Sequence, residues 1–124
     1  MKKKRPKTIY LERRVGVIFY GDEVLVRQEK EGRVMAGLYE FPYTALGEHF
    51  PFDFSLIEWR ELPLVKHGFT RYDVTLYPFL YKVDEKKSVD GFEWKRIGDL
   101  SSLPFSSGHR RILEILKDHA YFTH

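Results

Sequence analysis

The chain has 124 residues, of which 43% are hydrophobic and 31% are charged, as is typical of one soluble globular domain. The absence of cysteine excludes disulfides, cysteine-ligated zinc and iron–sulfur clusters within this chain, and it fits a reducing compartment. No stretch approaches the roughly 18 apolar residues of a membrane helix, and no apolar run follows the cationic N-terminus. We therefore expect a cytoplasmic protein with no membrane partner.

The net charge of +3 comes from the N-terminal tail. Without its five cations, the chain has 16 positive and 18 negative side chains. Such a tail can bind nucleic acid by releasing counterions, although a solvated linker explains it equally well. We divide the chain into a basic linker at 1–8, a folded domain at 9–121 and a C-terminal end at 122–124. The tail cations are Lys2, Lys3, Lys4, Arg5 and Lys7.

The first half of the folded chain is predicted to be mostly strands. The β-branched and apolar residues of 9–20 predict a strand, and Gly21-Asp22 predicts a turn into a second strand at 23–28. Residues 37–43 predict a short strand that is stopped by Pro42. The aromatic-rich stretch that follows is ambiguous, and "DFSLIEW" at 53–59 is interpreted as a short helix.

The second half predicts three more strands and one helix. The strands are expected at 62–69, 71–83 and 91–97, and 98–105 is expected to be a loop. Ser107 is expected to cap a C-terminal helix in which Ile112, Leu113, Ile115 and Leu116 keep helical spacing. The predicted class is therefore α+β, with a mixed sheet, flanking helices and a clear C-terminal helix.

Few side chains have the spacing of a catalytic or metal site. None of the five histidines forms a pair with the spacing of a zinc helix, and the acids form no metal-binding cluster. His109 and Arg110 lie at a predicted helix start, where they could contact a phosphate, but a histidine there more often simply caps or packs. Glu40, between two aromatic residues, is expected to orient a loop.

Three segments together resemble a known family. "VGVIFYGDEVLVRQEKEGRVMAGLYEFP" looks like the opening of a Nudix-type domain. "HGFTRYDVTLY" and "LPFSSGHRRILEIL" are similar, in order and spacing, to two later segments of the C-terminal domain of A/G-specific adenine DNA glycosylase, the MutY family. The resemblance covers about residues 9–116 and implies a Nudix-like fold that recognises 8-oxoguanine opposite adenine in double-stranded DNA.

The resemblance assigns the lesion-reading loop to Gly68, Phe69, Thr70 and Arg71. In 8-oxoguanine, N7 carries a proton and C8 an oxygen, so the reader must offer an acceptor to N7 and a donor to O8. Phe69 could wedge beside the base, and Thr70 offers a hydroxyl where the family has serine. Arg71 departs from the family's histidine, and it could contact phosphate or alter the recognition. His67 is a further candidate DNA contact, and an ordinary hairpin end remains an alternative for the whole stretch.

The residues of a Nudix hydrolase box are missing. Aligning the box on Arg60-Glu61-Leu62 puts Leu64 and Val65 where paired glutamates should hold Mg²⁺, and Pro63 would break the helix that carries them. We therefore expect no catalytic residue, metal or cofactor in this chain. The resemblance implies a monomeric module that works with an N-terminal glycosylase domain, whose own iron–sulfur cluster would lie outside this chain. It also implies, in a bacterium, association with the nucleoid. The alternatives are a degenerate nucleotide-pyrophosphate hydrolase and a Nudix-like protein-interaction module.

Overall fold

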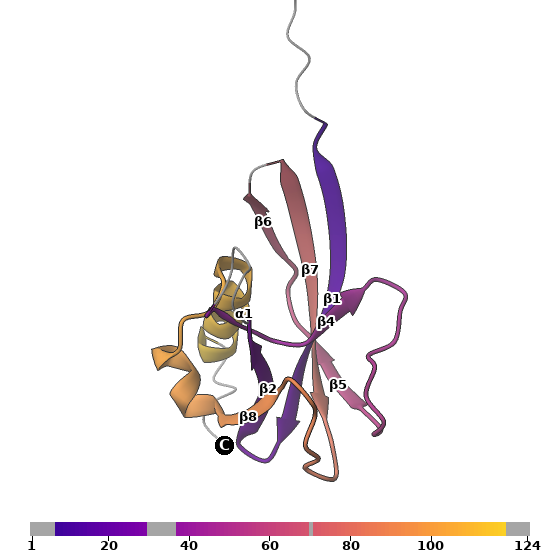
Figure 1. Ribbon diagram of the computed structural model, residues 1–124, viewed down its shortest axis with the longest axis vertical. Helices are drawn as coiled ribbons and strands as arrows, with labels where there is room; N and C mark the ends of the chain where they lie inside the picture. The colour runs from indigo at the N-terminus through magenta and orange to yellow at the C-terminus, as the bar shows by residue number, and fades with distance from the viewer. Residues whose placement is uncertain (1–6, 30–36, 70, 119–124) are drawn as a thin grey trace, which may run out of the picture.

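The computed structural model describes residues 7–29, 37–69 and 71–118. They form a mixed eight-stranded sheet with one α-helix and one 3₁₀ helix, as the predicted α+β class requires (Figure 1). None of the helices in this part of the chain is long and apolar enough to cross a membrane. The elements are β1 (Ile9–Tyr20), β2 (Glu23–Gln28), β3 (Tyr39–Glu40), β4 (Tyr43–Ala45), β5 (Ile57–Glu61), β6 (Val65–Phe69), β7 (Tyr72–Lys82), β8 (Glu93–Arg96), η1 (Ile97–Ser102) and α1 (Ser107–Asp118).

The two longest strands, β1 and β7, form the centre of the sheet. They pair in parallel along their whole length, from Ile9 opposite Tyr72 to Phe19 opposite Lys82. β2 and β4 flank β1, while β6 and β5 pair with successive halves of β7, all antiparallel. The continuous buried run Val15–Phe19 fits a strand that is covered on both faces. The predicted hairpin between β1 and β2 is confirmed.

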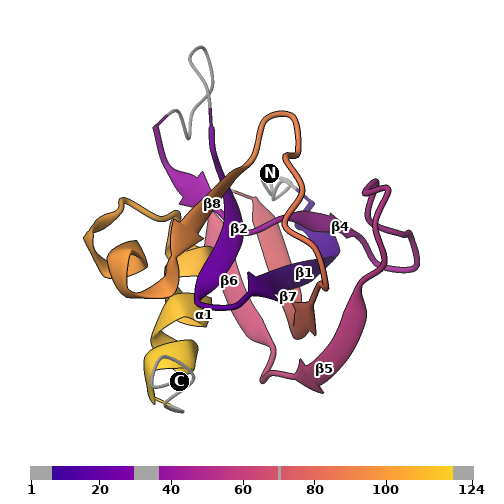
Figure 2. The same ribbon diagram turned by 90° about the horizontal axis from the view of Figure 1, so that it is seen from below.

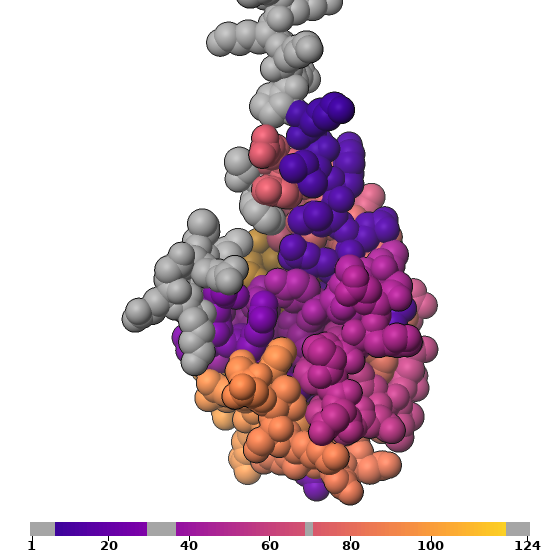
Figure 3. Space-filling view, turned by 45° about the vertical axis from the view of Figure 1, so that its right-hand side comes forward, coloured from indigo at the N-terminus to yellow at the C-terminus, as the bar shows by residue number. Residues whose placement is uncertain are grey.

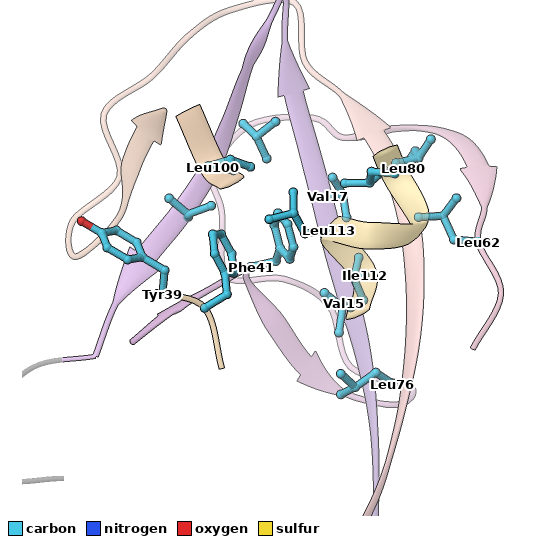
Figure 4. Close-up of a cluster of buried hydrophobic side chains, with 14 of the residues drawn as sticks. Val15, Val17, Tyr39, Phe41, Leu62, Leu76, Leu80, Leu100, Ile112 and Leu113 are labelled. Atoms are coloured by element: carbon cyan, nitrogen blue, oxygen red, sulfur yellow. The ribbon is translucent and has the colours of Figure 1, made fainter. Parts of the chain in front are cut away.

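The larger core lies between the sheet and α1. Ile112, Leu113 and Leu116 form the buried stripe of α1 and pack against Val17, Leu80 and other side chains of the sheet (Figure 4). Seen from below, α1 covers one face of the sheet next to β6 (Figure 2). The C-terminal helix is thus confirmed, and it begins at Ser107 itself rather than after it.

The opposite face of the sheet is covered by an irregular aromatic segment. The rings of Phe50, Phe52 and Phe54 stack almost in parallel, with centroids 5.9 and 5.2 Å apart. Phe52 also meets Phe92 edge-on at 5.6 Å, and Phe50 meets Tyr81 in the same way at 5.8 Å. We call this set, Phe50, Phe52 and Phe54, the phenylalanine ladder. Figure 3 shows the magenta segment that contains it beside the orange segment that leads from β7 into β8.

The short helix predicted at 53–59 is wrong. Residues 53–56 are irregular, and β5 starts at Ile57. Phenylalanines at every second position suit an extended chain, which places all three rings on one side. The segment therefore follows the two-residue period of an extended chain rather than the 3.6-residue period of a helix. Two other expectations need adjustment. The strand of 37–43 is reduced to β3, with β4 beginning after Pro42, and the loop at 98–105 begins with η1.

Candidate functional site

The stretch that the sequence singled out forms the end of a hairpin. β6 and β7 pair from Val65 opposite Leu76 to Phe69 opposite Tyr72, so a two-residue connection joins them. Gly68 and Arg71 therefore lie at this end, and both are exposed. Thr70 and the side chain of Phe69 lie outside what the structure describes. Their predicted roles in lesion contact stay predictions.

The start of β1 lies against the same hairpin end. The Ile9 amide donates a hydrogen bond to the carbonyl of Arg71, with 2.8 Å between nitrogen and oxygen. Lys7 is exposed and lies two residues before Ile9, so the first described residues lie beside the hairpin (Figure 1). The other tail cations, Lys2, Lys3, Lys4 and Arg5, lie outside the described residues.

Two cations that the sequence analysis missed extend this basic end along β6. The Arg111 guanidinium donates through Nη1 to the Lys66 carbonyl at 2.8 Å, and both side chains are exposed. Lys66 and Arg111 are 45 positions apart in the chain. Their proximity depends on how α1 packs on the sheet, so no local sequence signal could have revealed it. Together with Lys7 and Arg71 they give four exposed cations at or near the hairpin.

The two candidate histidines lie against the start of α1. His67 is half-buried, and a Cβ added to Gly108 would lie 2.7 Å from its ring, so only glycine fits there without a shift. Burial lowers the pKa of His67, and the positive charges of Arg111 and Arg13 lower it further. A neutral imidazole can offer a hydrogen bond to DNA but no charge for a phosphate.

His109 is a core residue rather than a surface contact. Its side chain is 5% exposed, and its Nδ1 accepts a hydrogen bond from the Phe41 amide at 3.0 Å. Burial, followed by the nearby charges of His67, Arg13 and Arg27, lowers the pKa of His109 to about 3. The ring is therefore neutral and inside the fold. These contacts favour the packing alternative, and a phosphate contact of His109 stays a prediction.

Arg110 is also held by the fold itself. Its Nη2 donates to the Leu103 carbonyl, and its guanidinium lies 5.7 Å from the centre of the Phe105 ring. These contacts fix the turn before α1. A DNA contact through the Arg110 guanidinium would break these contacts, and it stays a prediction.

Glu40 forms a part-buried ion pair with Arg27, and the sequence alone did not predict this partner. Its Oε1 accepts hydrogen bonds from Arg27 at 3.0 and 3.2 Å. The ring of Tyr43 lies 4.7 Å from the guanidinium of Arg13 and 5.4 Å from that of Arg27. Burial raises the pKa of Glu40, although Arg27 opposes this shift. The pair ties β2 to β3, so Glu40 lies in a strand, whereas the sequence analysis expected it to orient a loop.

The remnant of the hydrolase box is not on a helix. Arg60 and Glu61 lie in β5, Leu62 follows it, and residues 46–56 contain no helix. Across the described part of the chain, no three or more histidine, aspartate or glutamate side chains come together as a metal site. The side chains present here therefore offer no oxygen cluster of the kind that Mg²⁺ prefers.

The sheet order, the parallel central pair and the C-terminal helix on one face define a Nudix-type fold. The sequence model of the NUDIX domain matches residues 14–115, and the chain belongs to this family. A search of the curated proteins finds no significant match.

Solved structures agree on the fold at low sequence identity. The MutT protein from Methanosarcina mazei Go1 superposes with a TM-score of 0.71 at 12% identity, covering 94% of this chain and 99% of that one. The C-terminal domain of mouse MUTYH, solved in complex with human PCNA, gives a TM-score of 0.61 at 18% identity, with 88% of each chain covered. A MutT from methicillin-resistant Staphylococcus aureus gives 0.63 at 18% identity, covering 95% and 99%. Similarities at this level establish the fold alone.

Proposed function

We propose that this domain recognises 8-oxoguanine paired with adenine in double-stranded DNA, through the end of the β6–β7 hairpin, as the non-catalytic module of an adenine DNA glycosylase. The observation that carries the proposal is the hydrogen bond between Ile9 and Arg71. It joins the start of the domain to the hairpin end. A glycosylase domain that preceded this chain would therefore be tethered beside the lesion-reading hairpin.

The charges around the hairpin support binding to a nucleic-acid backbone. Lys7, Lys66, Arg71 and Arg111 are exposed at or near this end, and the remaining tail cations precede Lys7 in the chain. Without these four residues and the other four tail cations, the chain has 13 positive and 18 negative side chains, so its net positive charge depends on this group. Phosphate contacts of this kind orient a protein on a duplex without reading its sequence, which leaves recognition of the lesion to the hairpin.

The absence of the box supports a binding role over hydrolysis. A nucleotide-pyrophosphate hydrolase needs carboxylates that hold Mg²⁺, and the phenylalanine ladder covers the sheet face opposite α1 without supplying any such cluster among the described residues. The proposal therefore requires that the chain not hydrolyse nucleoside triphosphates with Mg²⁺.

A second candidate, a protein-interaction module, is favoured by one surface. Ile57 and Trp59 on the edge strand β5 are 42% and 50% exposed, and Leu64 nearby is 51% exposed. However, the pairing of β5 with β7 is irregular between Glu58 and Arg60, and such bulges protect an edge from pairing. We therefore keep lesion recognition as the main proposal.

The variant Thr70→Ala tests the proposal at the hairpin. We expect it to weaken binding to a duplex with 8-oxoguanine opposite adenine more than binding to the same duplex with guanine opposite adenine. A good base-edge contact contributes roughly 1–3 kcal/mol of discrimination, and backbone groups would retain part of it. Arg71→Ala serves as the comparison and should weaken both duplexes similarly. Equal losses on both duplexes for Thr70→Ala would remove the support for a role of this hydroxyl in reading the lesion.

A further inference from the structure

The backbone of Gly68 faces outward from the edge of the sheet. In an antiparallel pair, opposite residues alternate between pairs that exchange both hydrogen bonds and pairs whose amide and carbonyl groups point away from each other. Lys66 lies opposite Thr75, and Gly68 opposite Asp73. Both residues of β6 belong to the same alternate set, so their amide and carbonyl groups share one direction.

Two hydrogen bonds at opposite sides of the hairpin fix that direction. The Lys66 carbonyl accepts from Arg111 of α1, so Lys66 points away from β7. The Arg71 carbonyl accepts from Ile9 of β1, so the odd-numbered residues of β7, including Asp73, point toward β1. Both observations place the amide and the carbonyl of Gly68 on the free edge. Neither group has a hydrogen-bond partner in another element among the described residues.

This edge is accessible near Gly68. Gly68 is exposed and has no side chain to shield its backbone, and in Figure 1 the hairpin end extends beyond α1. A Cβ added to Gly68 would lie 3.3 Å from the Tyr72 carbonyl oxygen, so a side chain here would press on the hairpin. Glycine thus leaves one donor and one acceptor open side by side at the tip.

We propose that the amide and carbonyl of Gly68 read the N7–C8 edge of 8-oxoguanine. The lesion would donate from N7–H to the Gly68 carbonyl and accept from the Gly68 amide at O8. Plain guanine has a lone pair at N7 and a hydrogen at C8. Its N7 would therefore face the Gly68 carbonyl as a second acceptor, and its C8–H would offer no acceptor to the Gly68 amide. The inference rests on the proposed function and assigns the specificity within it.

Backbone groups can distinguish the two bases more sharply than the Thr70 hydroxyl can. The Thr70 hydroxyl can donate or accept, so alone it could bond to N7 of either base. A carbonyl only accepts and an amide only donates, and the hairpin fixes both in direction. Gly68 therefore supplies discrimination, and the hydroxyl adds affinity.

The matched variants Gly68→Pro and Gly68→Ala test this assignment. Both introduce a Cβ, but proline alone removes the amide proton. Proline is compatible with the site because the amide points off the edge and Gly68 does not have a positive φ. We expect the preference for 8-oxoguanine–adenine over guanine–adenine DNA to fall at least about fivefold further in Gly68→Pro than in Gly68→Ala. Binding to the guanine duplex should change little between the two.

A second measurement covers the case in which Gly68→Pro does not fold. In the wild-type chain, exchange of the Gly68 amide proton should slow when the 8-oxoguanine duplex binds, but not when the guanine duplex binds at equal saturation. Equal preference in the proline and alanine variants, or no selective protection of this amide, would overturn the inference. A wild-type chain without any lesion preference would instead overturn the proposed function. Slowed exchange on addition of an extended peptide, with none on addition of DNA, would identify β6 as a strand-pairing edge.

Discussion

The imidazole of His109 lies inside the fold, where it joins α1 to the chain between β3 and β4. Its Nδ1 accepts a hydrogen bond from the Phe41 amide, so the proton of the neutral ring is on Nε2. Nε2 lies 4.0 Å from Oε2 of Glu40, which is too long for a hydrogen bond. Protonation would place a donor opposite the Phe41 amide and bury a charge, so the contact depends on a neutral ring.

This position predicts how stability changes with pH. The pKa of His109 is about 3 in the folded chain, below its usual value of 6.5 in the unfolded chain. The unfolded state therefore binds the proton first as the pH falls, and the free energy of unfolding should decrease below about pH 6.5. The slope from one such group is about 1.4 kcal/mol per pH unit at most. Urea titrations between pH 7 and pH 5 measure this change.

His109→Asn is the matched control, because the asparagine side-chain oxygen can accept the hydrogen bond from the Phe41 amide and does not titrate. His67, whose pKa is also lowered, adds to the slope in both proteins, and Glu40, whose pKa is raised, opposes it in both. The pKa of Arg27 is raised, so this group stays charged over the whole range. The difference between the proteins therefore isolates His109, and identical slopes would show that its proton is not linked to folding.

For individual residues, the sequence predicted where a side chain lies in the fold better than which residues it contacts. The stretch Gly68–Arg71 was identified because a glycine, an aromatic residue, a hydroxyl and a cation precede a strand, and two of these residues do lie exposed at a hairpin end. The core position of His109 was left open, because its bond to Phe41 spans 68 positions. Contacts over such a separation follow from packing, which local spacing does not encode.

At the scale of elements, the phenylalanine ladder is the feature that the sequence predicted least well. It occupies a stretch interpreted in part as a helix, and it covers the second sheet face with stacked rings and the side chains of Phe79 and Phe92. Strands with strong β-branched and aromatic patterns, such as β1, β2 and β7, were predicted well. The ladder was not predicted, because the alternation of its phenylalanines indicates an extended chain only when the sheet face that the rings cover is known.

Phe52 is the centre of the ladder and should be important for stability. Its ring contacts Phe50, Phe54 and Phe92 and is half-buried. We expect Phe52→Ala to lower the free energy of unfolding by about 2 kcal/mol, less than the roughly 3–5 kcal/mol typical of a fully buried ring. Leu46→Ala, at a position that is 45% exposed in the same segment, is the control and should cost less than about 0.5 kcal/mol. Equal, small losses in both variants would show that the ladder does not hold this face.

On the scale of the whole molecule, the fold gathers several exposed cations at one end of a long sheet. The parallel pairing of β1 with β7 brings the start of β1 to the hairpin end. The order of the three motif segments was enough to predict the Nudix-like fold, because each segment keeps its own turn and strand pattern. The charge at the hairpin could be predicted only in part, since Lys66 and Arg111 meet through α1.

The central claim is that this end of the molecule distinguishes an oxidised base from a normal one. The most direct test compares the affinity of the wild-type chain for two duplexes that differ only in 8-oxoguanine or guanine opposite adenine, at one salt concentration. Phosphate contacts contribute equally to both, so they cancel in the ratio. We predict a preference of at least about fivefold for the 8-oxoguanine duplex, the low end for one good base-edge contact. Equal affinities, with binding to both duplexes measurable, would contradict the claim.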